Sequence, residues 1–260
     1  MMGKFLRQIR SVAGYPLKTV IYRLFSIRLI VTSQPIKPTS ASAMVFAPHQ
    51  DDESFGCGGM IAFKRASKIP VKVVYLTDGQ KTYGWDRIPT QTLIATRQQE
   101  ALQALDVLGV PPEDVIFLGQ VDGSLQVLND TCRQSLIIKL VHLLSGFQPE
   151  EVYVTYRQDG HPDHEAAYSL VREAIRQAGL QLDLLEYPVW SLYQPFHLNF
   201  SAPEFKDFYR LPIAAVQTSK RQAIACHRSQ YVPIPPDTQG GLSQIFLKRL
   251  SSPYEFFFKN

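Results

Sequence analysis

Residues 44–59 read MVFAPHQDDESFGCGG, and residues 151–164 read EVYVTYRQDGHPDH. In each stretch an apolar run typical of a buried strand leads into histidines and carboxylates. The first run is followed by His49 and three acids, and the second by the tetrapeptide His161-Pro162-Asp163-His164. Ligands of open α/β sheets bind at the carboxyl ends of the strands. The two motifs therefore predict one shared site at the end of a parallel sheet.

The rest of the chain alternates between strand and helix patterns. Strand-like runs occur at residues 44–47, 71–77, 115–118, 151–156 and 184–189, and helical patterns at residues 59–68, 93–108, 133–144, 165–178 and 219–228. Strands that alternate with helices of this length indicate a mostly parallel sheet with helices on both faces. We therefore expect a single-domain α/β fold of the Rossmann-like type. After Trp190 the pattern loosens into aromatic residues and prolines.

Length and composition are those of a globular protein. The 260 residues are 45% hydrophobic and 19% charged, enough for one large domain with a sizeable core. The cysteines Cys57, Cys132 and Cys226 are odd in number and have no Cys-x-x-Cys spacing. This usage is typical of a reduced compartment, so a cytoplasmic location is expected.

The net charge of +4 is unevenly distributed. Residues 1–43 contain seven Lys or Arg and no acid, which leaves residues 44–260 at about −3, with 20 basic against 23 acidic residues. A body without a basic excess argues against nucleic acid as a partner. We expect two parts, a basic helical arm with a linker at 1–43 and the main domain at 44–260.

Two interpretations of the basic arm stay open. Basic residues interrupt its only long apolar stretch, so a spanning helix is not expected, and a secretory signal ending at Ala41-Ser42-Ala43 fits poorly. One apolar stripe recurs at helical spacing and comprises Leu17, Val20, Ile21, Leu24 and Phe25. The helix either packs on the outside of the domain or makes a peripheral contact with a membrane surface.

The two motifs carry the residue types of a metal site. Imidazole nitrogens and carboxylate oxygens bind catalytic divalent metals, typically zinc with three protein ligands and one open position. Taken alone, His-Pro-Asp-His is also a helix start, with Pro162 near the first helical position and Asp163 in the first turn. Because both motifs follow strands, the metal site is favoured.

The glycine run at residues 56–59 is not a nucleotide-binding loop. It lacks the Gly-x-Gly-x-x-Gly spacing, and a phosphate there would face the three acids at 51–53. We expect these glycines to let the loop pack closely as the chain turns into its helix.

In order along the chain, the motifs resemble the LmbE / PIG-L family of zinc-dependent deacetylases, which act on N-acetylglucosamine conjugates. The matching segments are PHQDDE at 48–53, GCGG at 56–59, LTDG at 76–79, RQQE at 97–100, FLG at 117–119 with Asp122-Gly123, HPDH at 161–164, and Lys220 with HRSQ at 227–230. They span roughly residues 44–230. Gln50 departs from the family, which most often has proline there, but it lies between the implied ligands.

The resemblance implies a role for each polar residue of the two motifs. The zinc ligands would be His49, Asp52 and His164, holding one ion per chain. Asp51 would be the general base that takes a proton from the attacking water. A charged His161 would stabilise the oxyanion, and Asp163 would orient it and keep it charged.

Four further positions would lie around the sugar. The resemblance implies Arg97 and Asp122 as substrate-binding residues. From the sequence alone, Arg97 could equally form a solvated pair with Glu100, and Asp122 could be a turn residue. Tyr83 and Trp85, in a long loop, could stack on a sugar face.

The sequence thus predicts a hydrolase that releases acetate and a free amine from a small amino-sugar conjugate. The aglycone and the oligomeric state stay open at this point. The alternatives are an amidase that uses the same site on a different amide, and a non-catalytic sugar-binding or scaffold protein with the same fold.

Overall fold

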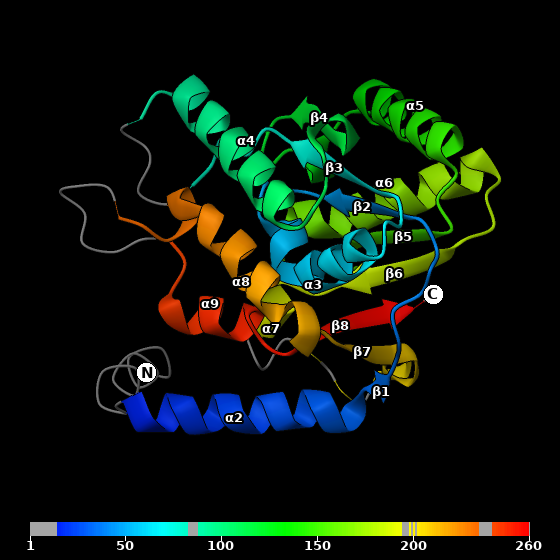
Figure 1. The fold of residues 1–260 in the computed structure, drawn as a ribbon. Coiled ribbons are helices and arrows are strands. Elements are labelled where there is room, and N and C mark those ends of the chain that lie inside the picture. The colour runs from blue at the N-terminus through cyan, green and yellow to red at the C-terminus, as the bar shows by residue number, and fades with distance from the viewer. Residues whose placement is uncertain are drawn as a thin grey trace, which may run out of the picture.

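The computed structural model describes residues 15–82, 88–193, 198, 200, 202–233 and 241–259. Its strands are β1 (Gln34–Pro35), β2 (Ala43–Ala47), β3 (Val71–Thr77), β4 (Val115–Gln120), β5 (Glu151–Thr155), β6 (Asp183–Tyr187), β7 (Phe208–Pro212) and β8 (Tyr254–Lys259). They form one eight-stranded sheet in the order β1-β7-β8-β6-β5-β2-β3-β4 (Figure 1).

Helices cover both faces of this sheet. They are α2 (Tyr15–Thr32), α3 (Asp52–Ala66), α4 (Thr90–Val107), α5 (Asp130–Phe147), α6 (Pro162–Ala178), α7 (Trp190–Tyr193), α8 (Gln217–Cys226) and α9 (Gln244–Leu250). Short 3-10 turns lie at Pro112–Asp114, Leu125–Val127, Pro203–Asp207, Ala214–Val216 and Arg228–Gln230. Figure 1 shows α5 and α6 on the side of the sheet away from α3, α4 and α8.

The alternation along β2 explains the two-sided core. Ala43, Val45 and Ala47 face the cluster that α3, α4, α8 and α9 cover, whereas Met44 and Phe46 face the cluster under α5 and α6. Successive side chains of a strand point to opposite faces, so a strand buried on both sides is apolar throughout. The predicted Rossmann-like fold is confirmed.

The parallel part of the sheet reverses its winding next to β2. This strand pairs in parallel with β3 on one side and with β5 on the other, and β6 continues beyond β5. The loops that follow β2 and β5 therefore diverge at neighbouring strand ends, which opens the crevice where ligands of such sheets bind. These loops carry the two sequence motifs.

The outer part of the sheet was not predicted. β8 pairs antiparallel with β6 and with β7, and β1 adds a short parallel edge beside β7. The apolar residues 256–258 are buried in β8. They were not assigned to a strand because the sequence showed no helix pattern before them. β1 lies at the start of the segment that the sequence assigned to a linker.

The helix after the first motif begins earlier than predicted. α3 starts at Asp52 rather than near residue 59, so the glycine run is helical and not a loop. A Cβ at Gly56 would stand 2.1 Å from the ring of Tyr187, and one at Gly59 would stand 2.6 Å from Ile213. The glycines therefore let α3 approach β6 closely, and Tyr187 in turn donates a hydrogen bond of 2.8 Å to the Phe46 carbonyl.

Helix α2 packs against the β7 and β8 side of the molecule. Phe25 and Leu29 are buried in a cluster with aromatic residues that include Phe208 and Phe258. Arg210 donates a hydrogen bond of 2.8 Å to the carbonyl of Ile30, near the end of the helix. Among the helices that the structure describes, none is long and apolar enough to cross a membrane.

The close approach at Gly56 predicts a stability difference between two glycine-to-alanine changes. Gly56→Ala should lower the free energy of unfolding by about 1–3 kcal/mol, because the added methyl group overpacks the Tyr187 ring. Gly146→Ala is the matched control, since a Cβ in that part of α5 meets nothing within 4 Å and should stabilise by about 0.5–1 kcal/mol. Urea denaturation measures both, and equal effects would contradict the packing role of Gly56.

Candidate functional site

The eight residues that the sequence singled out gather at the carboxyl ends of the central strands. A pocket of about 300 Å³ is lined by six of them, namely His49, Asp51, Asp52, Arg97, Asp122 and His161. Asp163 and His164 lie directly behind the pocket wall, in contact with His49 and Asp52. The folded chain thus brings all eight together from loops more than a hundred residues apart.

His49 is held by carboxylates at both ring nitrogens. The chain leaves β2 at Ala47, and the His49 backbone N–H donates to Asp52 Oδ2 at 2.9 Å. The ring Nδ1 lies 3.2 Å from the same oxygen. On the far side, Nε2 lies 3.1 Å from Asp163 Oδ2 and 3.2 Å from Asp122 Oδ1. Carboxylate oxygens thus lie at both ring nitrogens, and loss of the proton from Nδ1 would free that nitrogen to bind a metal.

His164 has the complementary arrangement. Its Nδ1 lies 2.7 Å from Asp159 Oδ2, and its Nε2 lies 3.3 Å from Asp52 Oδ2. That Nε2 is buried and makes no hydrogen bond to any residue that the structure describes. Buried polar atoms are rarely left in this state. Two imidazole nitrogens that converge on one carboxylate oxygen fit a divalent metal such as zinc in both donor type and number.

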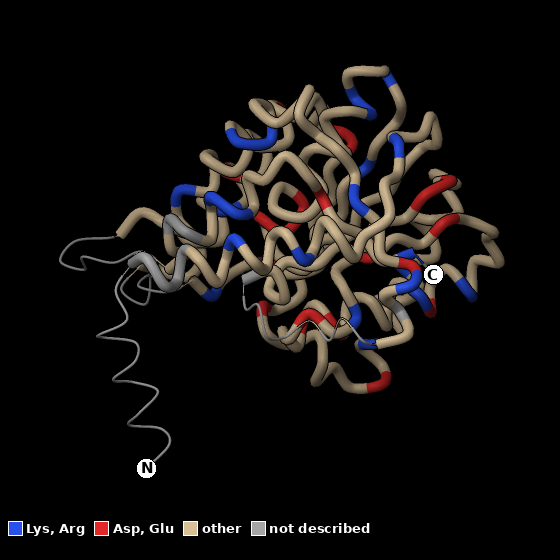
Figure 2. Tube along the Cα trace, turned by 90° about the horizontal axis from the view of Figure 1, so that it is seen from below, with Lys and Arg blue, Asp and Glu red and all other residues tan. Residues whose placement is uncertain are grey.

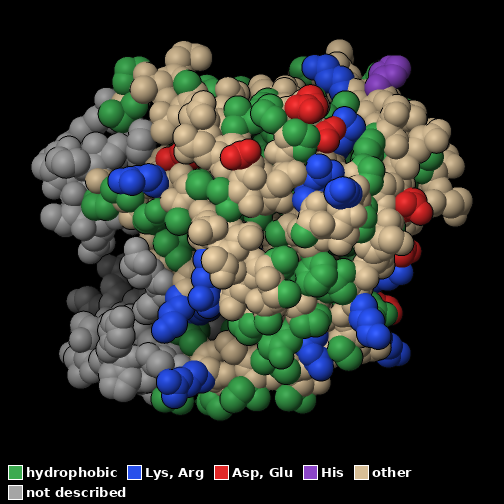
Figure 3. All heavy atoms as spheres, viewed as in Figure 1, with side chains coloured by type: hydrophobic (Ala, Val, Ile, Leu, Met, Phe, Trp, Pro, Cys, Tyr) green, Lys and Arg blue, Asp and Glu red, His purple; other side chains and the backbone are tan. Residues whose placement is uncertain are grey.

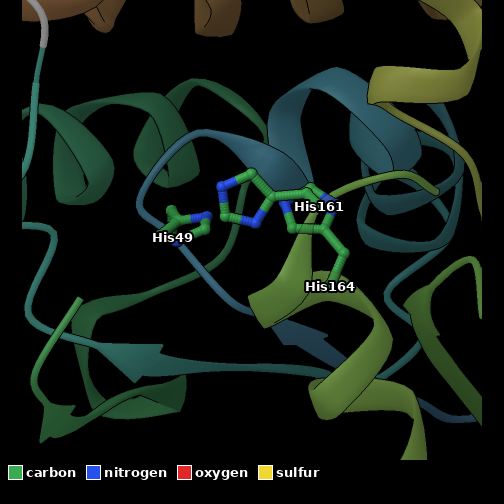
Figure 4. Close-up of side chains that lie close together, drawn as sticks. All are labelled: His49, His161 and His164. Carbon is green, nitrogen blue, oxygen red and sulfur yellow. The ribbon is translucent and has the colours of Figure 1, made fainter. Parts of the chain in front are cut away.

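The same pocket offers other groupings around His49. One ring nitrogen from each of His49, His161 and His164 lies within 4.8 Å of the other two, and Figure 4 shows the three rings close together. One ligand atom from each of His49, Asp122 and Asp163 also lies within 4.8 Å of the other two. His49 belongs to every grouping, whereas His161 competes with Asp52 for the position of third ligand.

The carboxylates set the protonation of the two buried histidines. Burial lowers the pKa of His49, but hydrogen bonds to Asp122, Asp163 and Asp52 outweigh it and raise the pKa well above the usual value. Burial likewise lowers the pKa of His164, yet the charge of Asp52 and the bond to Asp159 raise it to about 9. In the metal-free chain, protons on the two rings thus offset the excess of negative charge.

Asp51 and Arg97 form a buried pair at the pocket. Burial raises the pKa of Asp51 to about 6, while the charge of Arg97, whose Nη2 lies 3.4 Å from Asp51 Oδ1, lowers it. Arg97 also donates to the Gly79 carbonyl at 3.0 Å. The alternative of a solvated pair with Glu100 is wrong, because the Glu100 carboxylate accepts hydrogen bonds from Ser229 and Arg97 is buried.

Asp122 and Asp163 both turn towards His49. Asp122 accepts a hydrogen bond of 3.0 Å from the backbone N–H of Lys81, which joins the loops after β3 and β4. Asp163 accepts from the backbone N–H groups of Gly123 at 2.7 Å and Leu125 at 3.0 Å. Asp122 can therefore occupy a turn and contact His49 at the same time.

The surroundings of His161 differ from what the resemblance implied. The Asp163 carboxylate contacts His49, and it is the Asp163 backbone N–H that donates to His161 Nδ1, at 3.3 Å. Burial, together with the nearby charges of His164 and His49, lowers the pKa of His161 to about 4. The expectation of a charged His161 is thus not supported, since the neutral ring is the stable form near neutral pH.

Sequence reasoning missed the residues that position the candidate ligands His164 and Asp52 from the side away from the pocket. Asp159 accepts hydrogen bonds from the backbone N–H groups of residues 189–191 and fixes the His164 ring. It could have been found as an acid two positions before His161. Glu53 accepts a hydrogen bond from Ser54 and lies 3.5 Å from the buried His227, the first residue of the HRSQ segment.

Aromatic side chains form one wall of the pocket. The Trp190 ring stacks on His161, with the centroids 6.1 Å apart and an interplanar angle of 14°. Phe246 stacks on Trp190 from α9. Both line the pocket, and neither was singled out from the sequence. Tyr83 and Trp85, the aromatic residues that were, lie outside the described residues.

A doubly wound sheet with histidines and carboxylates gathered at its reversal point defines an α/β protein with a candidate metal centre between two βα loops. The model of the PIG-L family, described as GlcNAc-PI de-N-acetylase, matches residues 44–175. The chain belongs to this family, and the resemblance seen in its motifs is confirmed.

Named relatives agree with this assignment. The chain is 30% identical to the probable N-acetyl-alpha-D-glucosaminyl L-malate deacetylase 2 of Bacillus subtilis over 51% of its own length and 59% of that protein's. It therefore spans less than two thirds of this relative. With the diacetylchitobiose deacetylase of Thermococcus kodakarensis it shares 26% identity over 80% of this chain and 75% of the other.

Solved structures with low sequence identity share the fold of this chain. N,N'-diacetylchitobiose deacetylase from Pyrococcus horikoshii superimposes with a TM-score of 0.62 at 22% identity, covering 85% of this chain and 84% of that one. The zinc-inhibited form of teicoplanin deacetylase gives a TM-score of 0.61 at 17% identity, covering 84% and 97%.

The converging donor atoms predict about one bound divalent ion per chain, removable by chelation. His49→Ala, Asp52→Ala and His164→Ala should each lower the metal content, because each removes one donor. Asp159→Asn should weaken metal affinity by about 10–100-fold, the usual effect of losing the group that orients a ligand histidine. Metal analysis of the purified proteins measures the metal content of each variant, and titration with Zn²⁺ measures the affinity.

The exposed His142 on α5 provides the control for these variants. His142→Ala should keep the parental metal content. Full metal content in His164→Ala would contradict the ligand assignment, and loss in His161→Ala but not in Asp52→Ala would favour the three-histidine grouping.

Metal binding should release protons. The pKa of His164 is raised to about 9 and that of His49 lies well above its usual value, so both rings hold protons at pH 7 that must leave when they bind a metal. The apparent affinity for Zn²⁺ should therefore rise with pH up to about 9, where the His164 ring has lost its extra proton. Calorimetry in buffers of different ionisation enthalpy counts the protons, and zero release at pH 7 would contradict the raised values.

Proposed function

We propose that this chain is a zinc-dependent N-deacetylase that hydrolyses the acetamide of an N-acetylglucosamine-type conjugate to acetate and a free amine. The observation that carries the proposal is the convergence of His49 Nδ1 and His164 Nε2 on Asp52 Oδ2. A carboxylate holds the other nitrogen of each ring. The similarity to relatives named as deacetylases of amino-sugar compounds supports the substrate class.

His49, Asp52 and His164 would hold the ion at the base of the pocket. When bound, zinc supplies a Lewis acid for the amide carbonyl and lowers the pKa of a water molecule towards about 7. The donor atoms lie at the inner end of the crevice between the loops after β2 and β5.

Asp51 is the group best suited to accept a proton from the attacking water. Its carboxylate lines the pocket beside Asp52, and the neighbouring Arg97 favours the ionised form that a base needs. Burial opposes ionisation and raises the pKa of Asp51 to about 6, which brings the base closer to the operating pH. Arg97 thus supports the base, in addition to any contact with the sugar.

A neutral His161 can still stabilise the oxyanion. Its Nδ1 accepts a hydrogen bond from the Asp163 backbone N–H, so the ring proton of the neutral form belongs on Nε2. From the pocket wall, Nε2–H can donate to the carbonyl oxygen as negative charge develops there. The hydrogen bond to the backbone, rather than the Asp163 carboxylate, fixes the ring.

The pocket wall combines features that suit a sugar ring. Trp190 and Phe246 offer apolar faces, while Lys81 and Gln230 offer polar groups at the same opening. A pyranose has apolar C–H faces and a rim of hydroxyl groups, so this mixture matches it better than a purely apolar acyl chain. Asp122, at the same wall, contacts His49 and can also meet a hydroxyl group.

Replacing the proposed base should separate chemistry from metal binding. Asp51→Asn should keep the metal, because an amide has the same shape, but lower acetate release by about 10²–10⁴-fold, the usual contribution of a general base. Asp106→Asn, an exposed acid on α4, is the matched control and should keep the parental rate. Acetate is measured across a panel of N-acetylglucosamine conjugates, before and after chelation.

The outcomes distinguish the rival functions. Turnover of Asp51→Asn at the parental rate would contradict its role as the base. Turnover only of amides without an amino sugar would indicate an amidase. Saturable sugar binding without acetate release by the metal-loaded parent would indicate a non-catalytic sugar-binding protein.

A further inference from the structure

Helix α2 presents a second apolar surface, on the side away from the domain. Val20, Leu24, Ile27 and Val31 are 50%, 61%, 56% and 77% exposed, whereas Phe25 and Leu29 on the other side are 6% and 5% exposed. The four exposed residues recur at i, i+4, i+7 and i+11, so they form one continuous line along the helix. We call these four residues the outer stripe.

The outer stripe is unusual on this molecule. The other exposed large hydrophobic residues of the described chain lie on different segments and are Val107, Val121, Val127 and Ile138. Scattered exposed hydrophobics are normal on a protein surface, but a contiguous patch marks an interaction site. The single stripe expected from the sequence therefore divides in the structure, with Phe25 facing the domain and Val20 and Leu24 facing outward.

The domain holds α2 in this orientation. The Arg249 guanidinium lies 3.0 Å above the centroid of the Tyr22 ring, and the Phe25 ring packs edge-on against Phe200 at 6.1 Å. Arg210 hydrogen-bonds the carbonyl of Ile30, and β1 follows as a strand of the sheet. The inner side of the helix thus has its partners, and the outer stripe cannot turn inward without breaking them.

Basic residues flank the outer stripe on both sides. At 100° per residue, Arg23 and Arg28 lie about 70° to either side of its centre line. Both are exposed, and Arg28 also lies over the Phe200 ring at 4.3 Å. Hydrophobic and basic side chains lie along the lower edge of the molecule over α2 (Figure 3), and the trace seen from below has basic but no acidic positions on this helix (Figure 2).

From this geometry we infer that the outer stripe of α2 docks on the surface of an anionic phospholipid bilayer. In a helix that lies parallel to the membrane, the apolar stripe reaches the acyl boundary while arginines on both flanks extend to the lipid phosphates. From the sequence alone, both a helix packed on the domain and a helix lying on a membrane surface stayed open. In the folded chain, Arg23 and Arg28 occupy the two positions that such a helix requires.

Charge favours a lipid surface over a second copy of the chain. Residues 1–43 contain seven Lys or Arg and no acid. If two copies packed stripe against stripe, the flanking arginines of one helix would approach those of the other, with no acid on either α2 to offset them. Anionic headgroups supply that negative charge, each basic residue near the surface contributing about 1 kcal/mol.

The test uses the full chain and vesicles of two compositions. The parent should cosediment with phosphatidylglycerol–phosphatidylcholine vesicles, less so at higher salt, and should bind phosphatidylcholine vesicles weakly. Leu24→Ser combined with Ile27→Ser should lower the binding by at least about tenfold, because two side chains that would enter the acyl boundary are lost. Arg23→Gln combined with Arg28→Gln should remove most of the salt sensitivity.

Val107→Ser combined with Ile138→Ser makes the same chemical change on α4 and α5 and should bind like the parent. All variants should release acetate from a soluble substrate at the parental rate, which separates docking from the proposed activity. Equal vesicle binding by the parent and the Leu24/Ile27 variant, or none by the parent, would overturn the inference. A dimer that dissociates in the Leu24/Ile27 variant would instead identify a second copy as the occupant.

Discussion

The Asp52 carboxylate is the interaction on which the site depends. One of its oxygens accepts the His49 backbone N–H and lies between a ring nitrogen of His49 and one of His164. His49 follows β2, whereas His164 lies in the first turn of α6 after β5. The oxygen therefore joins the two halves of the doubly wound sheet. Further buried carboxylates, Asp122, Asp159 and Asp163, surround the same rings. Burying so many negative charges is costly unless positive charge balances them, so the carboxylates and the raised pKa values of the two histidines depend on one another.

The helices that follow the two motifs stabilise this concentration of charge. Asp52 is the first residue of α3, and Asp163 lies in the first turn of α6. The positive end of a helix dipole favours carboxylates at these positions. The early start of α3 also explains the glycines, since only residues without a side chain at 56 and 59 let the helix pass so close to Tyr187 and Ile213. The packing of α3 against Tyr187 and Ile213 therefore fixes the position of Asp52 at the start of the helix.

The sequence predicted what depends on local pattern. β2, β3 and β5 were found because their side chains alternate into two apolar layers. The two motifs were expected to meet because both follow strands whose carboxyl ends share one edge of a parallel sheet, whereas the choice of Arg97 and Asp122 and the role of each residue came from the family resemblance. β7 and β8 were missed because they pair antiparallel in a region without a strand–helix rhythm. The start of α3 was wrong because glycines normally favour loops, and the contact with Tyr187 that requires them comes from a strand about 130 residues later. The partner of Asp163 was missed for the same reason, since two motifs at neighbouring strand ends do not specify which histidine a carboxylate meets.

Helix α2 also shows what the sequence pattern alone cannot predict. Its apolar positions form one broad stripe in the sequence, and only the folded partners, Phe200, Phe208 and Phe258 among them, decide which part of that stripe is buried. These partners lie far along the chain, in the part whose pattern is least regular. Once they are in place, the residues left outside are too regularly spaced, and too consistently flanked by arginine, to be the incidental exposure of a packed helix. A helix that needed only to cover β7 and β8 would gain solubility from polar residues at 24, 27 and 31, so the aliphatic residues there require a second surface.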